Sequence, residues 1–259
     1  MTDQTVSPSS WAHSRNPAGR RHLLEDHHRV TARLARGFAN DFGAGDLAYY
    51  AALWHDVGKF NPAFQDYLFR CEQDPLAGGR GPDHKSAGAQ LALKSTPSLA
   101  LLVQGHHGGL KTPNHLRAWM AQRASDPAPD DAMARAQRAL PDLQPDGQLE
   151  LPKRVKDDEI SSEMFLRMVF SCLVDADYLD TEGHFSRVTR SVQQIEQSFL
   201  PVTMNQMTLQ YSFVYQWLAG CRTLQHFQNY QCSTVDCFQY KYIYTNFHCP
   251  STTPKTVLR

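Results

Sequence analysis

Apolar residues recur at helical spacing near the start of the chain. Between Leu23 and Phe38 they follow one another at intervals of three to four residues, which is the period of an amphipathic helix. A helix is therefore predicted from about His22 to Phe38. Within it, His27 follows Leu23 by one turn and precedes Leu34 by two, so its side chain is expected to face the core.

The same spacing predicts further helices over most of the chain before residue 200. Asn61 and Pro62 are typical of a helix start, because asparagine caps free amide groups and proline fits the first turn. No stretch in this part alternates apolar and polar residues over a convincing strand, so the predicted fold class is mainly α. The further helices are expected at about 46–56, 62–70, 85–94, 98–104, 114–124 and 161–179.

Composition divides the chain into a helical domain with two different ends. Residues 1–20 are polar and are expected to form a tail; residues 21–200 form the domain, in which the Pro-, Asp- and Gln-rich stretch 125–158 is expected to be a flexible insertion. After the domain, Asp236 is the only acidic residue, and four of the six cysteines occur there. Residues 201–259 are thus interpreted as an atypical C-terminal segment. It is either a small β-prone appendage or, as we favour, a segment outside the ancestral domain, such as a truncated end.

Charge and hydropathy exclude few functions but favour a cytoplasmic protein. Basic and acidic residues both number 26, so any surface that binds nucleic acid must be local. No stretch approaches the roughly 20 apolar residues that a membrane span needs, and the N-terminus lacks the apolar core of a signal peptide. The six cysteines form no CxxC pair and are expected to be free thiols in a reducing compartment.

Adjacent His55 and Asp56 end an apolar run and are followed by Gly58 and Lys59. A lone His-Asp pair is weak evidence, because such pairs occur by chance on surfaces. Here, however, the pair ends a buried helix, and burying two polar groups without partners would cost several kcal/mol. Metal binding is the simplest compensation, so this pair is the first candidate metal ligand set.

A second pair, His106 and His107, lies among glycines at the end of another apolar helix. Glycines permit a tight turn, so both rings could reach one centre from the same side, and imidazole suits first-row transition metals. The alternative is a solvated loop that happens to contain two histidines.

His27 and His84 are weak candidates when taken singly. A histidine on a core-facing helix is usually a hydrogen-bonded core residue, and His84 could be an ordinary helix-start residue. Their order strengthens them, because the chain then carries a metal-capable group on nearly every predicted helix. The last such group is Asp175 or Asp177, in the most apolar helix of the protein, where an unpaired carboxylate would be penalised.

The ordered pattern H…HD…H…HH…D resembles a known family. With HDVGK, GHHGG and LVDADYLDTE, residues 15–200 resemble the HD nuclease domain of the CRISPR-associated helicase-nuclease of type I systems. The intervening H…HH pattern distinguishes this family from the generic HD superfamily. The resemblance implies an HD-domain helical bundle that cuts the DNA strand displaced by an RNA-guided complex.

The resemblance also implies roles for individual residues, carried over by position. Asp56 would bridge two metal ions and, together with Lys59 near a phosphate oxygen, would be a catalytic residue. Asp177 is preferred over Asp175 as the last ligand, and His28 is interpreted as a neighbour. One metal would be held by His27, His55, Asp56 and Asp177, and the other by Asp56, His84, His106 and His107.

The residue types fit hydrolysis of a phosphodiester with two divalent metals, which can activate water and stabilise the attacking and leaving oxygens. A histidine-rich shell favours Mn, Co, Ni, Fe or Zn over Mg, which prefers oxygen ligands. No Ser-His-Asp or Cys-His arrangement stands out, so activated water is the expected nucleophile. A recessed site would admit single-stranded DNA more easily than a duplex, making this a predicted metal-dependent deoxyribonuclease.

No GxxxxGK[ST] motif is present, so an ATP-driven motor is not expected in the chain. The expected partners are therefore single-stranded DNA, a separate CRISPR-associated helicase and an RNA-guided type I effector complex acting in antiviral defence. Two alternatives remain: an HD phosphohydrolase acting on a nucleotide or cyclic nucleotide, and a non-catalytic metal-binding docking module.

Overall fold

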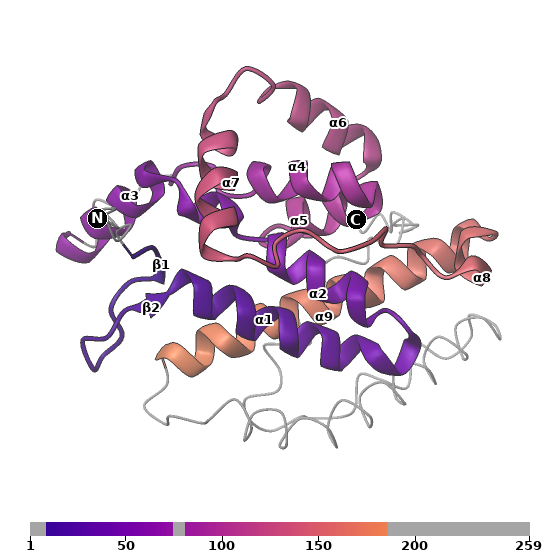
Figure 1. Cartoon of the computed structure of the whole chain (residues 1–259), viewed down its shortest axis with the longest axis horizontal. Helices are drawn as coiled ribbons and strands as arrows, with labels where there is room; N and C mark the ends of the chain where they lie inside the picture. Colours follow the sequence, from indigo (N-terminus) through magenta and orange to yellow (C-terminus); the bar gives the residue numbers. More distant parts are fainter. Residues whose placement is uncertain (1–8, 75–80, 186–259) are drawn as a thin grey trace, which may run out of the picture. The chain divides into compact units, whose positions relative to one another are not determined.

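The computed structural model describes residues 9–74 and 81–185, and the mainly helical fold predicted from the sequence is confirmed (Figure 1). Within the described residues, no helix combines the length and the apolar character that crossing a membrane requires. The elements are β1 (Trp11–His13), β2 (His22–Leu23), α1 (Leu24–Ala39), η1 (Asn40–Phe42), α2 (Gly45–Trp54), η2 (Val57–Phe60), α3 (Pro62–Gln73), α4 (Ser86–Ser95), α5 (Pro97–Gly105), α6 (Pro113–Ala121), α7 (Ala128–Ala139), α8 (Lys153–Lys156) and α9 (Glu159–Phe185).

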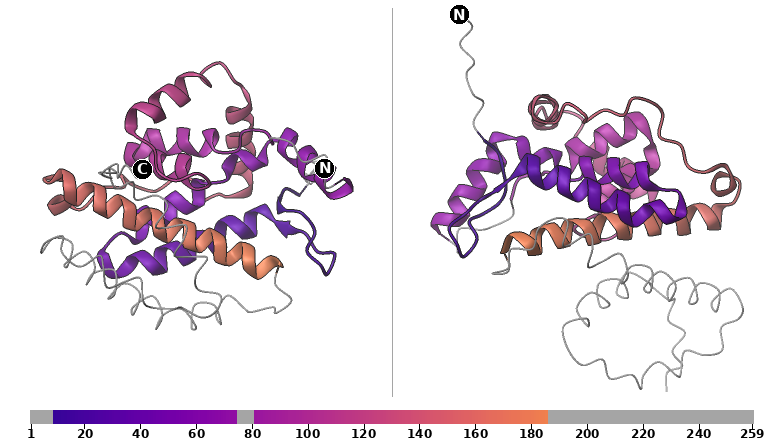
Figure 2. Two further views of the ribbon diagram at one scale, coloured as in Figure 1. Left: turned by 180° about the vertical axis from the view of Figure 1, so that it is seen from behind. Right: turned by 60° about the horizontal axis from the view of Figure 1, so that its bottom comes forward.

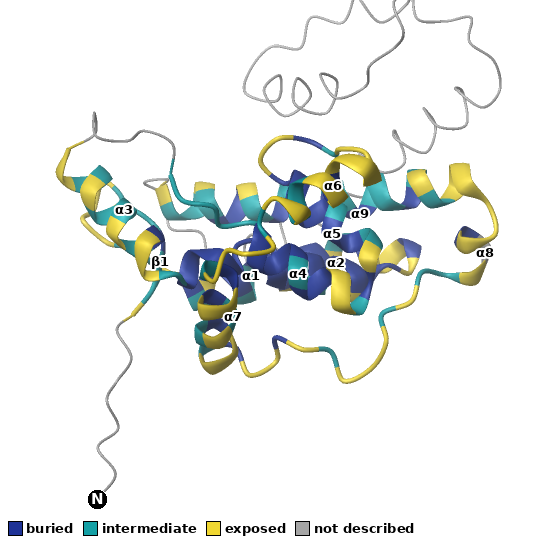
Figure 3. Ribbon diagram, turned by 90° about the horizontal axis from the view of Figure 1, so that it is seen from above, coloured by how far each residue is buried: buried dark blue, intermediate teal, exposed yellow. Residues whose placement is uncertain are grey.

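Helices α1, α2 and α9 pack on one another and form the centre of the bundle, with α9 running alongside α1 (Figure 2). Small buried residues let the helices approach closely: Ala32 and Ala35 on α1 and Ala176 on α9 are fully buried. The α4–α5 pair contacts α2, so the buried faces of these helices form one continuous core (Figure 3).

Two glycines bring α4, and His84 shortly before it, against the end of α2 and the turn that follows. A Cβ atom at Gly88 would lie 1.8 Å from the carbonyl oxygen of Trp54, and one at Gly58 would lie 2.3 Å from the carbonyl oxygen of His84. The amide of Gly58 donates a hydrogen bond of 3.0 Å to that same His84 oxygen. Only glycine permits these approaches, which place His84 beside the turn that follows α2.

The stretch 125–158, expected to be a flexible insertion, contains helices α7 and α8. Neither helix was predicted from the sequence. Helix α7 begins where the amide of Ala128 donates to the Asp126 carboxylate, at 2.9 Å. Its alanines Ala132 and Ala136 are fully buried, and the helix packs on η2 and α4. Alanine is only weakly apolar, so the buried face of α7 does not show a clear helical period in this polar sequence.

A short hairpin occupies part of the expected N-terminal tail of residues 1–20. Strands β1 and β2 pair antiparallel, with Trp11 opposite Leu23 and His13 opposite His22. The amide of Trp11 also donates to the side chain of Gln65, at 2.9 Å. Strands of two or three residues are too short to show an alternating pattern, which is why the sequence predicted none.

The predicted helix boundaries are otherwise close to those observed. The Asn61 cap is present, because the side-chain oxygen of Asn61 accepts from the amide of Ala63, at 2.9 Å. Helix α9 extends beyond the predicted 161–179 to Phe185. The predicted C-terminal segment 201–259 lies outside the described residues.

Candidate metal centre

The first half of the site forms where α1, the end of α2 and α9 meet. Nε2 of His27 lies 3.2 Å from Nε2 of His55 and 3.7 Å from Oδ2 of Asp56, and Nε2 of His55 lies 3.3 Å from the same oxygen. Oδ1 of Asp177 lies 3.4 Å from the His27 nitrogen and 3.6 Å from the His55 nitrogen. Four candidate ligand atoms from three helical elements therefore face one another.

The second half lies on the other side of Asp56. Oδ1 of Asp56 is 3.4 Å from Nε2 of His106, which follows α5, and 3.8 Å from Nε2 of His84, which precedes α4. The ring of His107 lies 4.0 Å from that of His106 and 5.1 Å from that of His84, measured between centroids. Ligand atoms of these four residues all lie within 4.8 Å of one another. Asp56 thus takes part in both halves, one oxygen toward each.

Hydrogen bonds to the backbone fix the orientation of the histidine rings. Nδ1 of His55 donates to the carbonyl oxygen of Ala52 at 2.6 Å, and Nδ1 of His106 donates to that of Val103 at 2.7 Å. A carbonyl oxygen only accepts, so Nδ1 carries a proton and Nε2 is the atom turned toward Asp56. This is the arrangement that orients metal-binding histidines in proteins.

His27 is oriented by a carboxylate instead of a carbonyl. Its Nδ1 donates to Oδ2 of Asp180 at 2.6 Å, and both side chains are buried. Asp180 was not among the site residues predicted from the sequence. The available signal was its spacing: Asp180 follows Asp177 by three residues on α9, so the two carboxylates lie on one face of the helix.

The structure brings Asp177, and not Asp175, to the histidines. Two residues along an α-helix correspond to roughly 200° of rotation, so the side chains point in different directions. Burial raises the pKa of Asp175 to about 6, and the His55 and His27 contacts described above are made by Asp177. His28 is fully buried and stacks on Phe60 at 5.7 Å between ring centroids, which makes it a core residue.

Lys59 is turned toward the centre of the cluster. Its ammonium group lies 2.6 Å from Oδ2 of Asp56 and donates to the carbonyl oxygen of Ala12 at 3.2 Å. The side chain is buried, so its charge is held against Asp56 and the hairpin. The sequence predicts that Lys59 contacts a phosphate oxygen. The phosphate and Asp56 would then both bind this ammonium group.

The charges in the cluster shift several pKa values. Burial opposes ionisation of Asp56, but the charges of Lys59 and His55 hold its pKa well below the usual range. Burial also lowers the pKa of His106 to about 4, and partial loss of hydration lowers those of His84 and His107 to about 4. These three rings are therefore neutral at pH 7, which is the form that binds a metal.

On the first half of the site the histidine pKa values shift the other way. Burial would lower the pKa of His55, but the carboxylates of Asp56 and Asp177 raise it to about 10. The pKa of His27 is likewise raised, against the effect of burial, by Asp180 and Asp56. Without a metal ion, protons on these two histidines therefore offset the negative charge of the carboxylates. A divalent cation would displace those protons on binding.

Of the buried atoms at the centre that have no hydrogen-bond partner, three face one another: Oδ1 of Asp56, Nε2 of His84 and Nε2 of His106. A buried polar atom without a partner costs free energy comparable to a lost hydrogen bond, so three that face one another call for a common ligand. Nitrogen and carboxylate donors suit a divalent transition metal. The cluster therefore fits a metal ion.

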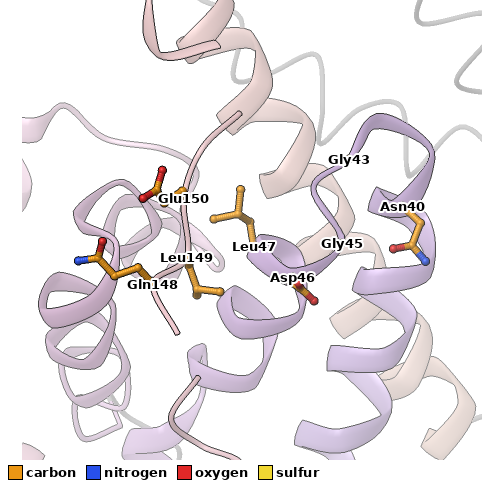
Figure 4. A pocket seen from close by; sticks show the side chains of 8 residues that line it. All are labelled: Asn40, Gly43, Gly45, Asp46, Leu47, Gln148, Leu149 and Glu150. Carbon is orange, nitrogen blue, oxygen red and sulfur yellow. The ribbon is translucent and has the colours of Figure 1, made fainter. Parts of the chain in front are cut away.

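A separate cavity of about 320 Å³ lies near the start of α2 (Figure 4). Its lining residues include Asn40, Asp46, Gln148 and Glu150, and none of the clustered histidines. The cavity has no part in the chemistry of the cluster.

A family model described as Cas3, HD domain matches residues 10–174, well over half of the chain. The matched part contains the cluster from His27 to His107, whereas Asp177 and Asp180 follow it. None of the curated proteins compared matches the chain. The mainly helical bundle agrees with this family. The chain belongs to the Cas3 HD domain family.

Proposed function

We propose that this chain is a metal-dependent deoxyribonuclease that hydrolyses phosphodiester bonds of single-stranded DNA in type I CRISPR interference. The family is one of metal-dependent HD nucleases and phosphohydrolases associated with CRISPR machinery and nucleic acid. The observation that carries the proposal is the position of Asp56, whose two carboxylate oxygens face two separate sets of histidines. This is the arrangement that a bridging ligand between two ions requires.

The two sets define the proposed ligands. His27, His55, Asp56 and Asp177 would hold one ion, and Asp56, His84, His106 and His107 the other. Five of the seven side chains are imidazoles, which favours Mn, Co, Ni, Fe or Zn over Mg.

When bound, the two ions would supply the positive charge that polarises the scissile phosphate and makes water more acidic. The protein's own part is to hold the ligand atoms in place. Lys59 keeps Asp56 ionised, and the carbonyl groups of Ala52 and Val103 hold the Nε2 atoms of His55 and His106 toward it. These interactions are made before substrate arrives, so little reorganisation is needed during the reaction.

Burial of the cluster supports a single-stranded substrate. Asp56, His55 and His106 are buried, and His107 is the exposed member of the set. A phosphodiester would therefore reach the centre from the side of His107. A single strand can bend its backbone into such a recess, whereas a duplex holds its backbone on a wide, stiff cylinder.

The proposal is tested with one panel of substrates and metal-free protein supplied with Mn²⁺ or Co²⁺. We expect cleavage of circular single-stranded DNA, little cleavage of the same circle as a duplex, and none with a chelator present. Adding a CRISPR-associated helicase with ATP should extend cleavage to the duplex. Hydrolysis of a nucleotide or cyclic dinucleotide without DNA cleavage would replace the proposal by the small-substrate phosphohydrolase. Stoichiometric metal binding with no hydrolysis at all would indicate a docking module.

A further inference from the structure

A second histidine cluster lies on the side of His27 that faces away from Asp56. It combines the hairpin residues His13 and His22 with Asp180 of α9, the carboxylate that orients His27. Nε2 of His22 lies 3.5 Å from Oδ2 of Asp180, and ligand atoms of His13, His22 and His27 lie within 4.8 Å of one another. The sequence pattern H…HD…H…HH…D does not include His13, His22 or Asp180.

The separation of His22 and Asp180 is that of two ligands around one ion. Two donors bound tetrahedrally at about 2.0–2.1 Å lie roughly 3.4 Å apart, close to the distance between His22 and Asp180.

Neighbouring groups hold these rings as the backbone holds those of the main centre. Nε2 of His13 is hydrogen-bonded to the hydroxyl group of Thr181 at 3.1 Å, which leaves its Nδ1 as the ligand atom. His184 stacks on His22 at 4.9 Å between ring centroids and donates to the carbonyl oxygen of Ser14 at 3.0 Å. The hairpin and the end of α9 are thus joined around the cluster on both sides.

We propose that His13, His22 and Asp180 form an auxiliary site for one divalent transition-metal ion, separate from the two-part centre around Asp56. Two imidazoles and one carboxylate are a donor set suited to Zn²⁺ or Co²⁺, with further positions left for water. Oδ2 of Asp180 faces His22 and also accepts the His27 hydrogen bond, and a carboxylate oxygen has two lone pairs, so this one atom can bind the auxiliary ion and keep that hydrogen bond. An ion here clamps the hairpin to α9 and fixes His27 through Asp180.

The test counts Co²⁺ ions bound per chain after removal of all metal. Each variant is titrated with Co²⁺, followed by its visible absorption and by elemental analysis of the desalted protein. His13→Gln and His22→Gln remove one auxiliary ligand each and leave Asp180 in place. His115→Gln is the matched control, because His115 is exposed on α6. All are also made together with Asp56→Asn, which alters the main centre.

We expect His13→Gln and His22→Gln each to bind one Co²⁺ fewer, in the wild-type chain and in the Asp56→Asn chain alike, while His115→Gln changes nothing. An unchanged count in both variants would overturn the proposal. Loss of an ion only when Asp56 is intact would also overturn it, because the effect would then pass through His27 to the main centre. Circular dichroism of the metal-free variants checks their folding. If one of the two histidine variants does not fold, the other alone tests the proposal. The difference in count persists even if the protein cuts no DNA, so the two proposals fail independently.

Discussion

The histidine rings of the cluster are oriented by hydrogen-bond partners of different kinds. His55 and His106 are oriented by backbone carbonyl groups, whereas His27 is oriented by the carboxylate of Asp180. Every such bond leaves Nε2 free to face Asp56. The sequence singled out the residues that face Asp56: His27 by the helix pattern, and the others by their motifs and their order along the chain. It did not identify Asp180, because an orienting residue shows no pattern of its own apart from its spacing from Asp177.

Replacing Asp177 by Asn should abolish most of the activity, whereas replacing Asp175 should not. Asp177 contacts both His27 and His55, and an amide is a poorer ligand for a divalent ion than a carboxylate. We expect Asp177→Asn to lower kcat/KM for single-stranded DNA by at least 100-fold and Asp175→Asn by less than threefold. Equal losses of activity in the two variants would contradict the choice of Asp177 over Asp175 as the ligand.

The stability of the metal-free protein should fall between pH 6.5 and pH 4. His84, His106 and His107 have pKa values lowered to about 4, so in this window the unfolded chain binds protons that the folded chain excludes. His55, whose pKa is raised to about 10, contributes a constant amount here because it is protonated in both states. His106 alone accounts for up to about 3 kcal/mol.

Urea denaturation at pH 7 and pH 5 measures this effect. The midpoint should be lower at pH 5, and His106→Gln should reduce the difference between the two midpoints. A midpoint that is independent of pH would mean that these rings are not buried as neutral groups.

At the scale of elements, close contact between α4 and the end of α2 holds the two halves of the site together. Gly88 lies on α4 directly against the carbonyl oxygen of Trp54, and Gly58 lies against that of His84. The helices themselves were predictable, because their apolar residues are periodic. The contact was not predictable. A glycine inside a helix indicates that another segment comes close, but it does not show which segment that is.

Gly88→Ala should destabilise the protein, because the new Cβ would lie 1.8 Å from a backbone oxygen that cannot move aside. Overpacking of this kind costs about 1–3 kcal/mol or more in the free energy of unfolding. Gly37→Ala is the control: Gly37 is on α1, and its Cβ would meet nothing within 4 Å. That substitution should stabilise the protein by up to about 1 kcal/mol. Thermal unfolding compares them, and a neutral Gly88→Ala would contradict the close contact.

For the molecule as a whole, two of the elements that the sequence did not reveal lie beside the metal centre. The hairpin brings Ala12 to Lys59, and α7 packs on η2, the turn that contains Lys59. Neither carries a strong apolar pattern: the strands are very short, and the buried residues of α7 are alanines. The family pattern marked the ligands, whereas these supporting elements depend on contacts between segments far apart in the chain.

Cleavage of circular single-stranded DNA by Asp56→Ala and wild-type protein, each loaded with Mn²⁺, tests the central claim most directly. Asp56 is the residue shared by both halves of the site, so its loss should lower the cleavage rate by at least 1,000-fold while the helical circular-dichroism spectrum is retained. Asp41→Ala, on an exposed position of η1, should cut at the wild-type rate. Equal cutting by Asp56→Ala and wild type would contradict the account.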